Sequence, residues 1–156
     1  MTLCETKLCV QFIWNTFFHH LDTWINLSGV DWAEFAFYNN MVDYHTAKQL
    51  CTTIGGILYE PKNQSVMQIV INQTQKANIG EFWIGIHDMD NEGTFVYDSD
   101  NSPISFTNWN FGEPNNAGLG EDCAIMNGHG KWNGLPCTDS QRSTVCFREK
   151  GVCISI

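Results

Sequence analysis

One segment of the chain concentrates side chains that could bind a metal ion. Residues 113–123 read Glu-Pro-Asn-Asn-Ala-Gly-Leu-Gly-Glu-Asp-Cys, and residues 131–134 add Lys-Trp-Asn-Gly. Four of these side chains offer oxygen atoms on stretches bounded by turn residues: Glu113, Asn115, Glu121 and Asn133. Because Ca²⁺ takes about six to eight oxygen ligands at roughly 2.3–2.6 Å, this segment could supply much of a calcium site.

The same residues have a simpler interpretation, because an acidic loop rich in asparagine can equally be a solvated turn region. The Glu113–Pro114 bond is a candidate cis peptide, a state found in about 5–6% of bonds before proline in folded proteins. A cis bond here would point the side chains of Glu113 and Asn115 to the same side. The spacing alone leaves both interpretations open.

The histidines and the nucleophilic side chains do not form a catalytic motif. His19 and His20 are sequence neighbours that would diverge on a helix, and none of the histidines belongs to a His-Glu-x-x-His motif. His87 precedes Asp88 and is expected at the end of a strand. No Ser, Cys or Thr lies in a recognisable nucleophile motif. We therefore expect a binding protein and not an enzyme.

Local patterns predict one strand followed by two helices. Residues 34–38 are rich in aromatic side chains and predict a strand. A helix is predicted over residues 44–53, with Asp43 as its N-cap and Gly55 after its end. Its inward face would consist of Tyr44, Ala47, Leu50 and Cys51. A second helix is predicted over residues 65–77, with an inward face of Val66, Ile69 and Val70.

After Gly80 the helical period ends and short strands follow. They are predicted at residues 82–86, 94–97, 122–126, 131–133 and 143–148. Residues 98–121 form a long connection dense in Asn, Asp, Gly, Pro and Ser, and connections of that length are usually functional or disordered. Trp109 and Phe111 within it predict an ordered loop with a small core of its own. Helices followed by strands indicate an α+β domain.

Several motifs in the right order make residues 32–147 resemble the C-type lectin domain family. Trp83-Ile84-Gly85-Ile86 resembles the buried core strand of the family, and Trp132-Asn133 resembles its second calcium segment. Glu113-Pro114-Asn115 matches the tripeptide with which the family binds mannose-type sugars. Four cysteines occupy positions like those of the framework cysteines of the family: Cys51, Cys123, Cys137 and Cys146.

The resemblance implies a fold and its boundaries. The fold would be an α+β, C-type lectin-like double-loop fold, with two helices, small antiparallel sheets and a long calcium-binding loop region. The framework disulfides would be Cys51–Cys146 and Cys123–Cys137. The carbohydrate-recognition domain would occupy residues 32–150, after an N-terminal extension at residues 1–31 and before a tail at residues 151–156.

The resemblance also implies two calcium sites. The principal site, which is also the sugar site, matches Glu113, Asn115, Glu121 and Asn133. The secondary site, which would stiffen the long loops, matches Asp88, Glu92, Asn116 and Asp122. The family has Asp after Trp132-Asn133, whereas this chain has Gly134, whose carbonyl oxygen could still coordinate. Loss of that carboxylate should weaken calcium binding, because ligand charge helps to set the affinity.

The implied function is calcium-dependent binding of glycans that end in mannose-type sugars. The order Glu113 before Asn115 resembles that of the family's sites for equatorial 3- and 4-hydroxyls, as in mannose, N-acetylglucosamine, fucose-like ligands and glucose. The alternative is a lectin-like module that binds a protein ligand, with calcium structural or absent. Gly134 favours this alternative somewhat, and the intact glutamate and asparagine set favours the sugar.

The composition fits one acidic domain. The 156 residues carry 8 Lys and Arg against 17 Asp and Glu, a formal net charge of −9 at pH 7. An acidic chain without a basic stripe is not expected to bind nucleic acid, and it suits a protein that holds a hard cation. No apolar run approaches the ~20 residues of a membrane span, so no membrane insertion is expected.

Seven cysteines without a Cys-x-x-Cys pair indicate an oxidising compartment. We therefore expect a secreted, extracellular protein. Three glycosylation sequons, which begin at Asn26, Asn63 and Asn72, weakly support this extracellular location. Residues 1–20 nevertheless make a poor signal peptide, because polar residues interrupt their apolar run. Either a leader has been removed from this sequence or export is unusual.

The two ends of the chain carry an apolar stripe and three further cysteines, and each has more than one interpretation. An apolar stripe at helical spacing is formed by Val10, Trp14, Phe17, Leu21 and Trp24. This stripe would belong to a helix that packs against its own domain, to a short self-association neck, or to a degenerate leader. Cys4, Cys9 and Cys153 remain after the framework pairs. One pair within the chain and one bridge between subunits would give a homo-oligomer, and a free thiol is the alternative.

Overall fold

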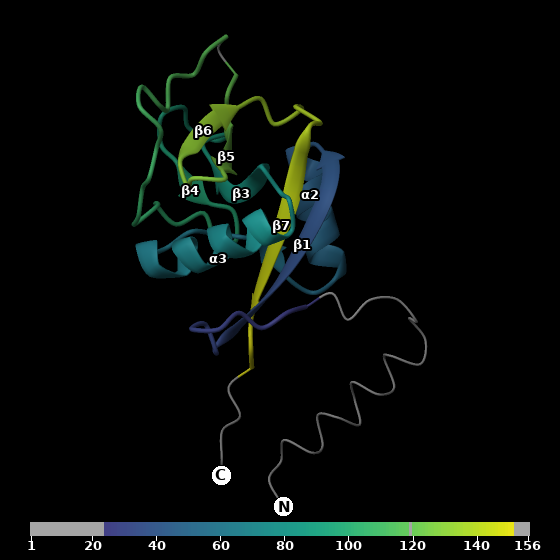
Figure 1. Ribbon diagram of the computed structural model, residues 1–156. Coiled ribbons are helices and arrows are strands. Elements are labelled where there is room, and N and C mark those ends of the chain that lie inside the picture. The colour runs from purple at the N-terminus through teal and green to yellow at the C-terminus, as the bar shows by residue number, and fades with distance from the viewer. Residues whose placement is uncertain (1–23, 119, 152–156) are drawn as a thin grey trace, which may run out of the picture.

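The computed structural model describes residues 24–118 and 120–151, which form two helices and seven strands (Figure 1). The elements in chain order are β1 (Ala33–Val42), α2 (Tyr44–Thr53), β2 (Ile57–Leu58), α3 (Gln64–Lys76), β3 (Glu81–His87), β4 (Val96–Tyr97), β5 (Cys123–Asn127), β6 (Trp132–Leu135) and β7 (Arg142–Glu149). The predicted α+β class is confirmed.

The described strands belong to one sheet. Its main path runs β1-β7-β3-β5-β6, while β2 pairs with β7 and β4 pairs with β3. Strands β3 and β7 run parallel, with Trp83 opposite Thr144, and the other pairs are antiparallel. The small antiparallel sheets that we expected are therefore joined into one mixed sheet, because the parallel pair connects them.

Helix α2 begins and ends where the sequence predicts. The Asp43 carboxylate accepts a hydrogen bond from the Thr46 backbone N–H at 2.7 Å, as expected of an N-cap. The predicted inward face is buried, apart from Leu50, which is half-buried. Gly55 follows with a φ of +82°, a left-handed conformation that lets the chain turn back after the helix.

Helix α3 begins one residue earlier than predicted. Asn63 Oδ1 accepts a hydrogen bond from the Val66 backbone N–H at 2.9 Å and so caps the helix. The buried side chains of α3 are Met67, Val70, Ile71 and Thr74. The predicted face was therefore partly wrong: Val66 and Ile69 are only partly buried, because the apolar stripe is centred on Met67 and Ile71.

Two clusters of buried side chains form the core. Trp132 lies in the larger cluster and Trp83 in the smaller, and both are fully buried. The disulfide Cys51–Cys146 joins α2 to β7, with its sulfurs 1.97 Å apart. The disulfide Cys123–Cys137 joins β5 to the segment after β6, with its sulfurs 2.04 Å apart. Both pairs implied by the resemblance are confirmed.

The described part of residues 98–121 contains no helix or strand, as predicted. In Figure 1 this connection forms the green loops above α3. Trp109 packs edge to face on Phe95, with ring centroids 4.7 Å apart, so the connection is an ordered loop with an aromatic contact. Phe111 was expected in the same small core, and this was wrong. Its side chain is fully exposed, because it lies at the tip of a tight turn.

Several expectations concern residues outside the described ranges. They are the helical stripe at residues 10–21 and the leftover cysteines Cys4, Cys9 and Cys153. Trp24, the last residue of that stripe, is described. Its indole N–H donates to the Ile54 carbonyl oxygen at 3.3 Å, just after α2.

The chain packs onto the core before β1 begins. Ile25 forms an antiparallel bridge with Phe35, and Leu27 and Val30 are buried. Among the described helices, none is both long and apolar enough to cross a membrane.

Candidate functional site

The oxygen-rich segment folds onto the hairpin of β5 and β6. Across this hairpin Ala124 pairs with Gly134, and Ile125 pairs with Asn133. The Gly134 backbone N–H donates to Glu113 Oε2 at 2.8 Å. The long connection is thereby tied to β6 at the residue that replaces the expected Asp.

Gly134 also lies against Glu121. A Cβ atom built on Gly134 would lie 3.2 Å from Glu121 Cβ, 3.3 Å from the Glu121 carbonyl oxygen and 3.5 Å from Glu113 Oε2. Glu113 and Glu121 therefore approach the same residue of β6. Little space is left there for a side chain.

The side chains of Glu113 and Asn115 lie on the same side of the loop. The Glu113–Pro114 peptide bond is cis, as the sequence suggested. Asn115 Nδ2 donates to Glu113 Oε1, so both carboxylate oxygens of Glu113 accept a hydrogen bond, one from Asn115 and one from Gly134. A carboxylate has about four lone-pair positions, so Glu113 can still accept from a further ligand.

Hydrogen bonds inside the loop hold Glu121 beside β6. The Ala117 backbone N–H donates to Glu121 Oε2 at 2.9 Å, and the Glu121 backbone N–H donates to Asn116 Oδ1 at 3.1 Å. Asn116 has a φ of +47°, a left-handed conformation that Asn tolerates better than most residues. These bonds engage the amide oxygen of Asn116, which the resemblance assigns to the secondary calcium site.

Asn133 provides the test of whether a cation fits. Its Oδ1 is buried and accepts no hydrogen bond from any described residue. A buried acceptor without a donor costs about 1–3 kcal/mol, and a hard cation would satisfy it. In the described ranges, no three His, Cys, Asp or Glu side chains are grouped so that they could hold a metal ion. A calcium ion would therefore use the amide oxygens of Asn115 and Asn133 in addition to the two glutamates.

The expected secondary site is partly assembled around Asp88, directly after β3. Asp88 is 3% exposed, its Oδ2 accepts from the Gly93 backbone N–H at 2.7 Å, and its Oδ1 is buried without a donor among the described residues. The Asp88 backbone N–H donates to the Asp122 carbonyl oxygen at 3.0 Å. Burial raises the pKa of the Asp88 carboxyl, and the Asp122 charge adds to this rise, against the Gly93 hydrogen bond. Glu92 is exposed on the turn that follows.

Trp132 supports the loop from within. It is fully buried, and its ring meets Trp109 edge to face, with centroids 5.5 Å apart. Its backbone N–H donates to the Asn108 carbonyl oxygen at 3.1 Å, and its carbonyl oxygen accepts from the Asn110 N–H at 2.8 Å. Residues 108–110 are therefore fixed to β6, three residues before Glu113.

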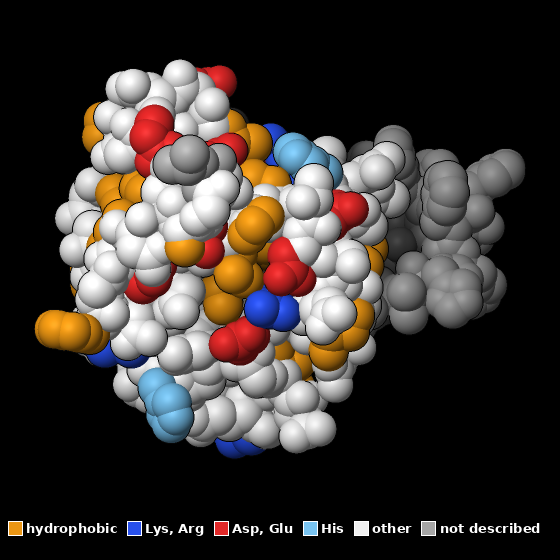
Figure 2. Space-filling view, turned by 90° about the horizontal axis from the view of Figure 1, so that it is seen from above, with side chains coloured by type: hydrophobic (Ala, Val, Ile, Leu, Met, Phe, Trp, Pro, Cys, Tyr) orange, Lys and Arg blue, Asp and Glu red, His pale blue; other side chains and the backbone are white. Residues whose placement is uncertain are grey.

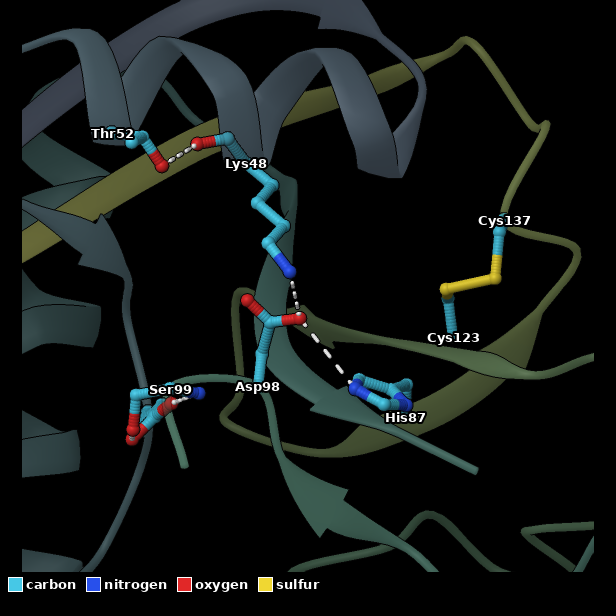
Figure 3. Close-up of polar contacts among 8 residues, drawn as sticks. Lys48, Thr52, His87, Asp98, Ser99, Cys123 and Cys137 are labelled. Atoms are coloured by element: carbon cyan, nitrogen blue, oxygen red, sulfur yellow. Dashed lines mark hydrogen bonds and ion pairs between the residues drawn. A yellow bond between two sulfur atoms is a disulfide. The ribbon is translucent and has the colours of Figure 1, made fainter. Parts of the chain in front are cut away.

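The start of the long connection is held by a buried polar contact that the sequence analysis missed (Figure 3). Asp98 Oδ1 lies 2.8 Å from Lys48 Nζ on α2 and 3.5 Å from His87 Nε2 at the end of β3. Ser99 donates from its backbone N–H and its hydroxyl to Glu60, at 2.8 and 3.0 Å. No local sequence signal pairs residues so distant along the chain.

Figure 2 views the molecule from above, on the end where the long connection lies in Figure 1. Acidic side chains are spread over this face, with a basic side chain among them. A negative surface favours cations over phosphate groups, which agrees with the expectation from the net charge of −9.

Comparisons with known proteins identify the family of this chain. The family profile described as "Lectin C-type domain" matches residues 40–148. The low affinity immunoglobulin epsilon Fc receptor of Mus musculus is 40% identical over 100 residues, covering 64% of this chain and 29% of the receptor. The mannose-binding protein of Gallus gallus is 37% identical over 102 residues, covering 64% of this chain and 37% of that protein. The chain thus spans well under half the length of these relatives.

Solved structures agree. The cow C-type carbohydrate-recognition domain of CD23, determined in the presence of a GlcNAc2Man3 oligosaccharide, has a TM-score of 0.73 and 31% identity, covering 85% of this chain and 98% of that one. Human lithostathine has a TM-score of 0.71 at 20% identity, covering 84% of this chain and 100% of that one, which shows a shared fold. Together with the two framework disulfides, these matches show that the chain belongs to the C-type lectin domain family.

Proposed function

We propose that this chain is a calcium-dependent lectin domain for mannose-type sugars: mannose, N-acetylglucosamine and glucose through their equatorial 3- and 4-hydroxyls, and fucose through its equatorial 2- and 3-hydroxyls. The observation that supports this is the convergence of Glu113 and Glu121 on Gly134, which follows Asn133, whose buried amide oxygen has no donor among the described residues. A glycan partner also agrees with the names of two relatives, a mannose-binding protein and a domain studied with an oligosaccharide.

Each side chain has a defined part in this proposal. Calcium would be held by Glu113, Asn115, Glu121, Asn133 and the carbonyl oxygen of Gly134. When bound, calcium would supply open coordination positions for two sugar hydroxyls. The glutamates would accept hydrogen bonds from these hydroxyls and the asparagine amides would donate to them, because a hydroxyl both donates and accepts. No bond is broken, so we propose binding without catalysis.

A second calcium ion would stiffen the long loops and would not bind the sugar. The resemblance gives it Asp88, Glu92, Asn116 and Asp122 as ligands, although the three carboxylates are not grouped around one point in the described structure. The buried Asp88 Oδ1, which has no donor in the described part of the chain, supports a cation at this end of β3. The contact of Asp88 with Asp122 links this position to the residue after Glu121.

A protein ligand is the second candidate, and Gly134 is the observation that favours it. The expected Asp would add a negative charge, which Gly134 does not supply, and fewer ligand charges weaken calcium binding. The mouse relative is named as a receptor for an immunoglobulin Fc region. In this case calcium would be structural or absent, and the same surface would bind a protein.

We further propose a secreted protein that acts as a homo-oligomer. The disulfides Cys51–Cys146 and Cys123–Cys137 support an oxidising compartment. Single shallow sugar sites bind weakly, so several linked copies would raise the overall affinity. Cys4 or Cys9 would pair with Cys153 inside the chain, and the remaining one would bridge two subunits.

Calorimetric titration of the demetallated protein with Ca²⁺, with and without saturating mannose, tests the proposal. If both ligands use one site, mannose will tighten calcium binding, because coupling between two ligands is reciprocal. Galactose serves as the control sugar, since its 4-hydroxyl is axial, and it should leave calcium binding unchanged. Calcium binding that no equatorial-hydroxyl sugar tightens would reject the sugar proposal in favour of the protein ligand.

A further inference from the structure

Phe111 is the large hydrophobic side chain with the greatest exposure in the described ranges. Its relative exposure is 103%, against 63% for Met41, 50% for Trp32 and 39% for Met89. A single exposed apolar side chain is ordinary on a protein surface and carries no argument by itself. Phe111, however, lies two residues before Glu113, so its exposed ring is near the proposed sugar site in the chain.

Phe111 occupies the tip of a four-residue turn from Asn110 to Glu113. The Asn110 carbonyl oxygen accepts from the Glu113 backbone N–H at 3.1 Å, and Asn110 Oδ1 accepts from the Phe111 backbone N–H at 3.0 Å. Gly112, the third residue of the turn, has a φ of +83°. A positive φ at this position is typical of a type II turn and favours glycine. The turn therefore presents Phe111 outward.

Both ends of this turn are bonded to β6. The Asn110 backbone N–H donates to the Trp132 carbonyl oxygen at 2.8 Å, and Glu113 Oε2 accepts from the Gly134 backbone N–H at 2.8 Å. Trp132 is itself fully buried. The backbone that carries Phe111 is thus held against the core. Ligand binding at this turn would therefore lose little backbone conformational entropy.

The backbone places Phe111 close to the proposed sugar site. Two residues of fully extended chain span at most about 7 Å, and a turn spans less. A sugar at Glu113 and Asn115 would therefore have Phe111 within reach of its linked neighbour. The chain neighbours Asn110, Glu113 and Asn115 are polar, so they do not extend Phe111 into a large apolar patch.

We infer that Phe111 is the stacking surface for the second pyranose ring of an oligosaccharide whose terminal mannose-type sugar occupies the proposed site. The inference rests on the proposed function and extends it from a monosaccharide to a disaccharide ligand. The C–H-rich face of a pyranose can pack on the flat aromatic ring while its hydroxyls stay in water. Phe111 would then determine specificity for the sugar that follows the terminal one.

The test compares the full chain with its Phe111→Ala variant in calcium, by calorimetric titration. The probes are methyl α-mannoside and the three α-mannobioses linked 1→2, 1→3 and 1→6. We expect the affinity for methyl α-mannoside to stay within about twofold, while at least one mannobiose loses about three- to tenfold. Phe111→Trp should restore that mannobiose, because it restores the aromatic face. Met41→Ala, which removes another exposed side chain, should change neither affinity.

The outcomes separate this inference from the proposed function. If the parent chain binds methyl α-mannoside in calcium and Phe111→Ala weakens no mannobiose selectively, the stacking role is wrong and the sugar site stands. If the parent chain binds none of these sugars, the proposed function fails and the stacking role fails with it. A change in sedimentation of Phe111→Ala without a change in any sugar affinity would instead assign Phe111 to a protein contact.

Discussion

At the residue scale, Gly134 sets the charge and the space of the proposed site. Its backbone N–H donates to Glu113, and a Cβ atom there would approach Glu121 to 3.2 Å. We predict that Gly134→Asp tightens calcium binding by about tenfold, because a third carboxylate joins two glutamates around the ion. The same variant should lower Tm in chelator, since three carboxylates would then repel one another. Calorimetry and thermal unfolding measure the two effects.

Gly134→Ala is the matched control, because it adds the crowding without the charge. It should lower Tm in chelator and leave calcium affinity unimproved. Equal calcium affinities for the parent chain and Gly134→Asp would show that position 134 does not face the ion, and the ligand set would need revision.

Asp88 is a buried carboxyl whose raised pKa gives a prediction about stability. In calcium-free protein the folded state holds the proton of Asp88 more tightly than the unfolded state does. This group therefore lowers the stability above its folded pKa, and the lost stability returns as the pH falls through that pKa. Asp88→Asn keeps an acceptor for the Gly93 N–H, which the Asp88 carboxylate now binds at 2.7 Å. We predict a higher Tm than the parent chain in chelator at pH 7.

The difference between Asp88→Asn and the parent chain should shrink on acidification toward about pH 3.9, the ordinary pKa of Asp. With saturating calcium the order should reverse, because the variant loses a charged ligand. A lower Tm for Asp88→Asn in chelator at every pH would mean that the carboxylate stabilises the fold by itself.

At the element scale, Asp98 connects α2 and β3 to the start of the long connection. Its carboxylate lies 2.8 Å from Lys48 Nζ and is 5% exposed. We predict that Asp98→Asn costs about 1.5–3 kcal/mol of stability, the usual value of a hydrogen bond to a charged group. Denaturant unfolding measures this loss. Asp100→Asn is the control, because Asp100 is exposed and its Oδ1 acceptor for the Ser102 N–H is preserved. Equal stability of the two variants would reject the anchoring role of Asp98.

The elements also show what a sequence can predict. Helix α2 was predicted closely at both ends, because Asp43 and Gly55 are local signals for its start and its end. The two-residue strand β2 was missed, since it exists only through pairing with β7. Phe111 was assigned to a core on residue type alone, whereas a turn decides where it lies. The approach of Glu113 to β6 followed from family resemblance, because no periodicity relates a loop residue to a distant strand.

At the scale of the whole molecule, calcium should act as a stabilising ligand of an acidic chain. A ligand at about 100 times its Kd adds about 2.7 kcal/mol, which for a domain of this size raises Tm by about 5–10 °C. We predict this rise with CaCl₂ relative to chelator, followed by thermal unfolding at pH 7. Magnesium is the control, since it prefers smaller octahedral sites. The rise should disappear in acid, because calcium binding needs deprotonated ligands. An equal rise with both metals would argue for a general charge effect.

The last property of the whole molecule is its valency. A lone site of the proposed kind would bind one sugar weakly, and linked copies on a glycan surface can gain about 10²–10⁴ in apparent affinity. Seven cysteines include three beyond the framework pairs, an odd number that leaves at least one free or cross-linked to another chain. We predict a disulfide-linked dimer in non-reducing electrophoresis after thiol blocking, and its loss in one of the variants Cys4→Ser, Cys9→Ser and Cys153→Ser. That variant should keep its affinity for free mannose and release faster from a mannose-coated surface. A monomer in thiol-blocked parent protein would exclude the covalent bridge, and any avidity would then have to come from non-covalent assembly.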